Sequence, residues 1–316
     1  MLTYELSSED LVDIRFAVSP AAEAGLSMRA LRNPGRFPLQ LPWVRRVQPR
    51  LEQLDWDVLD CLLNDRMASP DFLAPHPESP LTRFEDELEA IASTNRETFE
   101  RQLVAINGQL PPALADRGAV GRVAEALREY WTLLIQPYWP RMRAVLSGDI
   151  SYRGYVLAQR GTAAMLNDLA PVITYEDGLL RVDRVSDPSR RERVGGRGLT
   201  LLPTMFGPYA VIPFDIGAPP LVGYPPRGQG LLWMSAEPAT PDDLARLLGA
   251  PKAQILTLVA ERPRTTRDLS LELGVTPSAV SQHLQVLRRN GLVEPYRVGK
   301  LVHYQGTDLT ALLVGR

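Results

Sequence analysis

Cysteine and histidine are scarce in this sequence of 316 residues. It contains one cysteine, Cys61, and three histidines, His76, His283 and His303. A single cysteine excludes an internal disulfide framework. A soft metal needs several thiolates or imidazoles that converge on one point, so a cysteine-rich zinc site is also excluded. We predict no bound metal, and we favour a buried core thiol over a redox sensor for Cys61.

Long apolar runs are also missing. No stretch approaches the roughly 20 apolar residues of a membrane span. The first residues carry acids where a signal peptide has basic residues followed by an apolar run. We therefore expect a soluble, cytoplasmic protein with no membrane partner.

The motifs of several enzyme classes are absent. The sequence has no G-x-S-x-G nucleophile elbow and no H-E-x-x-H metal pair. The GGRG stretch at 195–198 lacks the strand and helix context of a dinucleotide-binding loop. The acidic run Glu85, Asp86, Glu87 and Glu89 is interpreted as an exposed helix face. We therefore expect no enzymatic activity, no catalytic residues and no cofactor.

Charge is distributed unevenly along the chain. The length allows about two domains, and the formal net charge is −2. Residues 245–316 hold ten basic and five acidic residues, which gives +5, while the rest of the chain carries −7. A basic module on an acidic body indicates nucleic acid or another polyanion as the partner of that module.

Residues 1–235 show mostly helical patterns. Residues 1–6 are a possible strand, and Ser8 is expected to cap a helix over 9–18. The proline-rich stretch 69–80 is expected to be a loop. Apolar spacing and breakers predict further helices over 20–32, 51–62, 84–106 and 120–135, continuing to 169 with breaks near Pro137, Pro140 and Gly148.

Strand signals follow residue 171. Asp177-Gly178 favours a two-residue hairpin turn between strand-like flanks. The stretches LTLLPTMF and PLVGY predict further strands, and 225–241 has the composition of a linker. Residues 1–235 are therefore predicted to form a mostly helical domain with a small β-sheet.

Residues 240–316 have the pattern of a winged helix-turn-helix. Four helical segments are followed by two short strands around a Gly299-Lys300 turn and by a last helix. Gly274 provides the tight turn between the third and fourth helices. The fourth helix begins at Pro277, and its buried face is Val280, Leu284 and Leu287. The predicted fold class is α+β, with this module at the C-terminal end.

The helix that begins at Pro277 is predicted to lie in the DNA major groove. Its other face carries short hydroxyl and amide side chains, which suit base edges and nearby phosphates. These residues are Ser278, Ser281, Gln282 and Gln285.

Basic residues around this helix are expected to contact the DNA backbone. Arg262, Arg264 and Arg267 flank the preceding helix, where they can reach phosphates. Lys300 lies at the tip of the wing, where we expect a backbone or minor-groove contact. His283 and His303 are interpreted as structural residues rather than as metal ligands.

The C-terminal module resembles the ArsR/SmtB family of bacterial winged-helix repressors. The matching motifs are S-x-V-S-Q-H-L-x-x-L-R over 278–288, N-G-L-V over 290–293 and R-x-G-K-x-V-x-Y over 297–304. The resemblance implies a homodimer that binds palindromic double-stranded DNA and releases it when an effector binds. The positions that it places at the DNA are Pro277, Ser278, Ser281, Gln282 and Lys300. We also expect Arg297, at the start of the wing turn, to contact the DNA.

The sequence departs from the metal-sensing members of that family. Those members carry cysteines on the helix before the recognition helix, or histidine and aspartate ligands on the terminal helix. Residues 265–274 contain no cysteine, and residues 308–316 contain no histidine. The N-terminal region resembles an uncharacterised domain that precedes such winged helices, through the stretches DLVDIRFAVSP and RGLTLLPTMF.

Two functions remain open at this point. We favour a DNA-binding transcriptional regulator, acting as a repressor, whose residues 1–235 sense a non-metal effector or enlarge the dimer interface. The alternative is an N-terminal enzyme or protein-interaction domain whose winged helix makes protein contacts. Aromatic residues that are mostly core candidates could also line an apolar cavity for a small molecule. They are Tyr130, Trp131, Tyr138, Trp139, Tyr152 and Tyr155.

Overall fold

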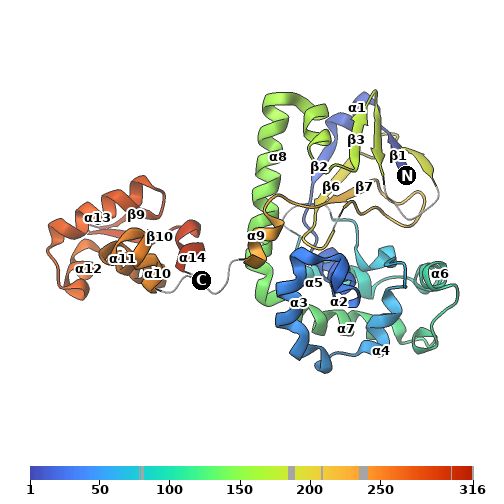
Figure 1. The fold of residues 1–316 in the computed structure, drawn as a ribbon, viewed down its shortest axis with the longest axis horizontal. Helices are drawn as coiled ribbons and strands as arrows, with labels where there is room; N and C mark the ends of the chain where they lie inside the picture. Colours follow the sequence, from blue (N-terminus) through green and yellow to red (C-terminus); the bar gives the residue numbers. More distant parts are fainter. Residues whose placement is uncertain are drawn as a thin grey trace. The chain divides into compact units, whose positions relative to one another are not determined.

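A computed structural model describes residues 1–77, 79, 82–183, 189–207, 209–234, 241–299 and 301–314. The chain divides into two compact units, Met1–Met234 and Ser235–Arg316 (Figure 1). Helices and small sheets occur in both units, so the predicted α+β class is confirmed. No helix in the described ranges is long and apolar enough to cross a membrane.

Helices of the larger unit pack around one apolar core. They are α2 (Pro20–Arg32), α3 (Leu41–Val47), α4 (Trp56–Leu59), α5 (Phe84–Ala92), α6 (Arg96–Asn107) and α7 (Ala119–Tyr130). Helix α2 begins where predicted, because the Ser19 side chain accepts the N–H of Ala22 at 3.0 Å and a proline occupies the first turn. Trp43, Phe99 and Tyr130 are fully buried in this core.

Within the described residues, the larger unit also contains two small sheets. Strands β1 (Leu2–Glu5), β3 (Ile173–Glu176), β4 (Leu179–Val182) and β5 (Arg190–Arg193) are ordered β3-β4-β1-β5. Strands β2 (Ile14–Phe16), β6 (Leu199–Pro203) and β7 (Leu221–Tyr224) form a parallel sheet. The predicted hairpin is confirmed: Asp177 and Gly178 have φ values of 49° and 76°, which its two-residue turn requires.

Helix α8 (Trp139–Asn167) connects the two parts of this unit (Figure 1). Met142, near its start, belongs to the helical core, and Met165, near its end, belongs to the core under the sheets. The break predicted near Pro137 and Pro140 is confirmed, because the 3-10 turn Gln136–Tyr138 precedes the start of α8, but the break predicted near Gly148 is wrong. A proline is tolerated in the first turn, where its missing N–H has no helical acceptor. The interruption lies instead at Gly161, with φ 81° and ψ 174°.

Three other local predictions for this unit are wrong. The helix expected over 9–18 stops early: α1 spans Ser8–Val12, and the next residues form β2, which pairs with β6. The amphipathic helix expected over 51–62 is divided into the short α4 and flanking 3-10 turns. The helix expected over 84–106 is divided into α5 and α6, because the Asn95 side chain accepts the N–H of Thr98 and starts a second helix. In the case of β2, a partner distant in sequence supplies the hydrogen bonds that decide the structure.

Two buried glutamates tie α2 to the rest of the larger unit. Glu87 was expected on an exposed helix face, but it is buried and accepts the N–H of Ala21 at 2.7 Å. Glu23 accepts the N–H of Met205 at 2.8 Å. Burial raises the pKa of Glu23 to about 8 and that of Glu87 to about 7.

The smaller unit is a winged helix-turn-helix, as predicted. Its helices are α10 (Pro241–Leu248), α11 (Ala250–Glu261), α12 (Thr266–Leu273), α13 (Pro277–Arg289) and α14 (Asp308–Val314). Strands β8 (Arg264–Thr265), β9 (Val293–Val298) and β10 (Leu301–Gly306) form a sheet ordered β8-β10-β9. Part of the predicted linker forms α9 (Gln229–Met234), while residues 235–240 lie outside the described residues.

Candidate nucleic-acid interface

Local hydrogen bonds fix the turn between α12 and α13. The Thr265 hydroxyl accepts the N–H of Asp268 at 3.2 Å, and the Asp268 carboxylate accepts the N–H of Thr265 at 2.9 Å. Gly274 ends α12 with φ 65°, a left-handed value that favours glycine. The Thr276 hydroxyl then accepts the N–H of Ala279 at 3.3 Å and starts α13. The helix pair is therefore held by capping groups that the sequence itself supplies.

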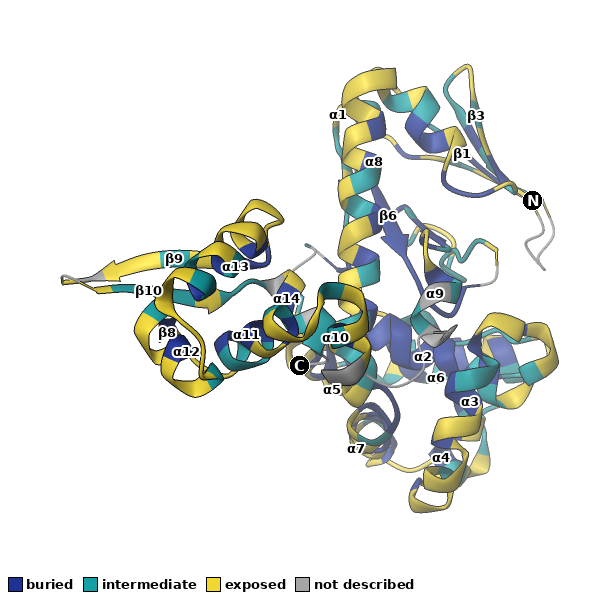
Figure 2. Cartoon of the chain, turned by 60° about the vertical axis from the view of Figure 1, so that its left-hand side comes forward, coloured by how far each residue is buried: buried dark blue, intermediate teal, exposed yellow. Residues whose placement is uncertain are grey.

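Helix α13 has one buried face and one open face. Val280, Leu284 and Leu287 are at most 1% exposed and contact α11 and α12 in the core of the unit. Figure 2 shows exposed residues along the other side of the helix. The predicted DNA-facing residues on that side are Pro277, Ser278, Gln282 and Gln285, which are exposed, and Ser281, which is half-buried. Their contact with DNA stays a prediction.

The basic residues divide into exposed and buried groups. Arg267 and Arg297 are exposed, as a phosphate contact requires. Arg264 is 7% exposed, and its guanidinium donates to the carboxylate of Glu272. Because that ion pair occupies the guanidinium, Arg264 holds α12 against the short strand β8, and a phosphate contact is not supported for it.

The wing is an antiparallel ribbon. Residues 293–298 of β9 pair with residues 301–306 of β10, and Gly299 has φ 60° at the turn. Lys300, the predicted tip contact, lies outside the described residues. His303 stacks on Tyr296 with ring centroids 5.6 Å apart, and it is paired in register with Thr265 of β8. This placement agrees with a structural role for His303.

Side chains that bind metals do not gather in the described ranges. No three histidine, cysteine, aspartate or glutamate residues there come together as a candidate metal site. Cys61 is half-buried, and its thiol donates to the carbonyl of Asp57 at 3.1 Å. Burial raises the pKa of the thiol, which disfavours the reactive thiolate.

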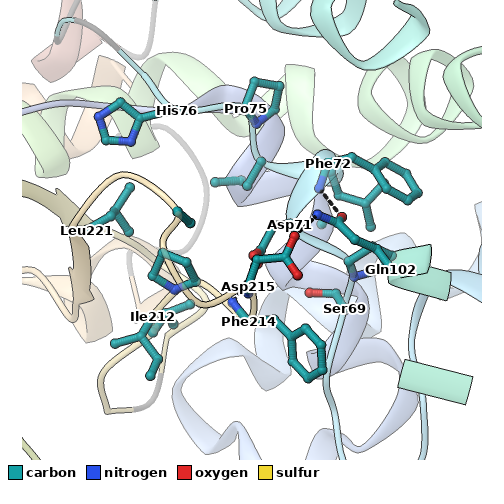
Figure 3. A pocket seen from close by; sticks show the side chains of 18 of the residues that line it. Ser69, Asp71, Phe72, Pro75, His76, Gln102, Ile212, Phe214, Asp215 and Leu221 are labelled. Carbon is teal, nitrogen blue, oxygen red and sulfur yellow. Dashed lines mark hydrogen bonds between the residues drawn. The ribbon is translucent and has the colours of Figure 1, made fainter. Parts of the chain in front are cut away.

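The larger unit contains a cavity of about 1220 Å³. It lies between α2, the loop at 69–77, α6 and the loop at 211–221, and Figure 3 shows Asp71, Gln102 and Asp215 on its wall. The aromatic residues suggested from the sequence do not line it. Tyr130 shares a hydrogen bond of 2.7 Å with Ser27 in the core. The tryptophan beside it stacks on a phenylalanine of α5.

No local signal in the sequence predicts this cavity. Its polar wall comes from segments that are far apart along the chain. Asp71 accepts the N–H groups of Phe214 and Asp215 at 2.8 and 2.7 Å, across a separation of more than 140 residues. No spacing rule connects positions so distant, so the cavity is visible only in the folded chain.

The match to a family model lies in the smaller unit. Residues 251–295 match the family model described as bacterial regulatory protein, arsR family. This confirms the family resemblance for these residues and supports a DNA-binding transcriptional regulator. No curated protein matches the chain.

Several solved structures share similarity with part of the chain. One is the apo form of a mutant of ZitR from Lactococcus lactis, with 24% identity over 24% of this chain and a TM-score of 0.21. The matched region spans 60% of the ZitR chain. Another is reduced HlyU from Vibrio cholerae, with 27% identity over 24% of this chain and 82% of that chain, and a TM-score of 0.21.

Proposed function

We propose that the protein is a homodimeric transcriptional repressor that binds operator DNA through α13 and releases it when an effector binds to the larger unit. The observation that carries the proposal is the open face of α13. Ser278, Gln282 and Gln285 are exposed there, while Val280 and Leu284 fix the helix from behind. A rigid helix that presents short polar side chains fits the major groove.

The residues of α13 have different expected roles. Pro277 and Ser278 lie in the first turn, where the positive end of the helix dipole favours a phosphate. Gln282 lies one turn further, where an amide can pair with both polar groups of an adenine edge. Arg267 and Arg297 are exposed on α12 and on the wing, and we assign them to phosphates. The base-reading and backbone roles thus fall on different elements.

Exposed leucines support the homodimer. Leu247 on α10 is 73% exposed, and Leu309 on α14 is 47% exposed. The two helices contact each other, so these side chains belong to neighbouring elements. A second copy of the chain that covers them would remove apolar surface from water. It would also set two α13 helices against successive major grooves.

The larger unit is proposed as the sensor and not as an enzyme. Its cavity of about 1220 Å³ exceeds the roughly 300–1,000 Å³ of a usual small-molecule site, so a small effector has room to bind there. The two acids on its wall, Asp71 and Asp215, are held by hydrogen bonds within the fold. A carboxylate that is fixed in this way supports the loops around the cavity. It is not placed as a free general base.

The proposed function is tested by recovering the DNA that the protein occupies in its own cells and footprinting it. We expect paired half-sites about one helical turn, roughly 34–36 Å, apart. Transcription of the adjacent genes should rise when the protein is removed. A fall in their transcription would contradict the repressor role, and the absence of any occupied site would contradict DNA binding.

The dimer is tested by sedimentation of the full chain. Leu247→Ser combined with Leu309→Ser should shift the protein to monomer and weaken operator binding. Leu271→Ser is the matched control, because this leucine is 74% exposed but lies on α12. A mass that stays monomeric in the unmodified protein at all concentrations would contradict the homodimer.

A further inference from the structure

The cavity of the larger unit has a mainly apolar wall. Its apolar side chains come from α2, the loop at 69–77, β6 and the loop at 211–221, and Figure 3 labels Phe72, Ile212 and Leu221 among them. Leu26, Phe72, Leu202, Ile212 and Leu221 are among them. A ligand of this cavity must therefore have an apolar body.

The acidic side chains of the wall are already paired. Asp215 accepts two hydrogen bonds from the guanidinium of Arg101, at 2.7 and 2.8 Å, and one from the amide of Gln102 at 2.6 Å. Asp71 accepts the backbone N–H groups of Phe214 and Asp215. These bonds close the loop at 211–221 over one side of the cavity. They leave no acid free for a cationic ligand.

One basic side chain of the wall is also fully engaged. Arg190 donates to the carbonyls of Phe214 and Pro213 at 3.0 and 2.6 Å. Its Nε lies 2.9 Å from the carboxylate of Glu192, close enough for an ion pair although the angle does not suit a hydrogen bond. Arg190 therefore supports the loop and is not available to a ligand.

Arg29 on α2 is different. Its Nη2 donates to the hydroxyl of Ser69 at 3.2 Å, while its Nε is buried and has no partner. Within the described part of the chain, no carboxylate lies within ion-pair distance of it. Burial lowers the pKa of the guanidinium to about 10, which still leaves it charged at neutral pH. A cation that is partly buried and has no acid beside it is stabilised by a counter-charge.

We propose that the cavity binds a small organic anion whose carboxylate or sulfonate pairs with Arg29 and whose apolar body fills the space between the two loops. The ligand class follows from the wall, which combines a large apolar surface with one partly buried cation that has no acid of the described residues within ion-pair distance. A planar guanidinium matches the two oxygens of such a head group. The assignment of this anion as the effector rests on the proposed function.

The wall of the cavity is connected to the end of the larger unit. Helix α2, which carries Arg29, also carries Glu23, and the Glu23 carboxylate holds the N–H of Met205. The carbonyl of Met205 accepts the side-chain amides of Gln40 and Gln229, each at 2.6 Å. Gln229 is the first residue of α9, after which the chain continues to the smaller unit. A shift of α2 on ligand binding would reach α9 through these bonds.

Two fluorescent probes of the full chain test the ligand class. The anion 8-anilinonaphthalene-1-sulfonate and the neutral N-phenyl-1-naphthylamine have the same apolar body. Arg29→Met should weaken the anion about tenfold, the loss of one charge-assisted bond, and leave the neutral probe unchanged. Arg29→Lys should retain most of the anion affinity. Arg32→Met is the control on the same helix, because Arg32 is already paired with Asp60 and Asp65.

A competition between the anionic probe and unlabelled ligands tests the same preference in the unmodified protein. Decanoate should displace the anionic probe at lower concentration than decan-1-ol. Equal displacement, or displacement by inorganic sulfate alone as strong as by decanoate, would overturn the proposal. Equal weakening of both probes by Arg29→Met would also overturn it.

A measurement of DNA binding tests the anion site and the proposed function separately. Decanoate should lower the affinity of the unmodified protein for its DNA, and Arg29→Met should bind DNA normally but no longer respond. Probe binding through Arg29 without any DNA binding would contradict the regulator and leave the anion site standing. DNA binding with no preference for the anionic probe would contradict the anion site alone.

Discussion

The two units of this chain differ in how far apart in sequence their decisive contacts lie. In the smaller unit, Thr265 and Asp268 cap each other three residues apart, and the wing strands pair across a short turn. In the larger unit, Glu23 reaches Met205 across 182 residues, and Arg101 reaches Asp215 across 114. A surface formed by the residues of one helix can therefore be predicted from the sequence. A cavity formed by segments that are distant in the sequence cannot.

The largest expected effect is the salt dependence of DNA binding by the smaller unit. In the proposed dimer, each protomer would offer the exposed Arg267 and Arg297, and also the exposed Arg288 of α13, to phosphates. Six such contacts give a slope of log affinity against log salt of about −5. Affinity should fall on the order of a thousandfold between about 50 and 200 mM salt. Fluorescence anisotropy with labelled operator DNA measures the slope. A slope near zero would show that the basic surface does not contact phosphates.

The next effect concerns the core that supports α13. Leu284→Ala should destabilise the smaller unit by about 2–5 kcal/mol, because the fully buried side chain leaves a cavity. Denaturant unfolding followed by circular dichroism should show this loss. Binding of the neutral naphthylamine probe by the larger unit should be unchanged. Gln285→Ala, on the open face, is the control and should be nearly neutral.

The third effect belongs to the larger unit and depends on pH. Burial raises the pKa of Glu23 from 4.5 to about 8 in the folded state, so folding favours its protonated form. Its contribution to stability is complete below about pH 4.5 and is lost as the pH rises through about 8. Glu23→Gln should therefore remove about 2–4 kcal/mol of pH dependence. Unfolding curves between pH 5 and 9 measure it, and Glu89→Gln, at an exposed position, should change nothing.

The smallest expected effect is that of thiophilic metals. Zinc, cadmium and arsenite should leave the protein–DNA complex intact, because Cys61 is the only cysteine of the chain. Titration of each metal into the complex, with Cys61→Ser as control, measures the response. Release of DNA by micromolar metal that Cys61→Ser abolishes would contradict a non-metal effector.

The sequence predicts the smaller unit better than the larger unit, because the decisive contacts of the smaller unit are local. The helices and wing of the smaller unit and its buried row on α13 were predicted, because caps, glycine turns and apolar spacing act locally. The burial of Arg264 was not, since Glu272 and the two-residue strand β8 engage it only after folding. In the larger unit, the hairpin at Asp177 was predicted. Strand β2 was missed, because its partner β6 lies far along the chain.

The cavity shows why the remainder of the site was missed. The aromatic residues were predicted as possible cavity walls, since apolar pockets often have aromatic walls. Tyr130 and Trp131 pack in the core instead. The partly buried cation Arg29 is one of many arginines in a chain with few lysines. Nothing in its local sequence distinguishes it from Arg32, one turn along the helix, which forms ion pairs at the surface.

The central claim is that α13 contacts base edges while the exposed arginines contact the phosphates of the DNA. It is tested most directly by the ratio of the affinity for operator DNA to the affinity for a scrambled duplex. The affinities of the unmodified protein, Gln282→Ala and Arg267→Ala are measured by anisotropy for operator DNA and for a scrambled duplex at one salt concentration. Gln282→Ala should lower the ratio of operator affinity to scrambled-duplex affinity by the equivalent of about 1–3 kcal/mol. Arg267→Ala should weaken both duplexes alike and leave the ratio unchanged. Equal ratios for the two variants would contradict the assignment of α13 to the major groove.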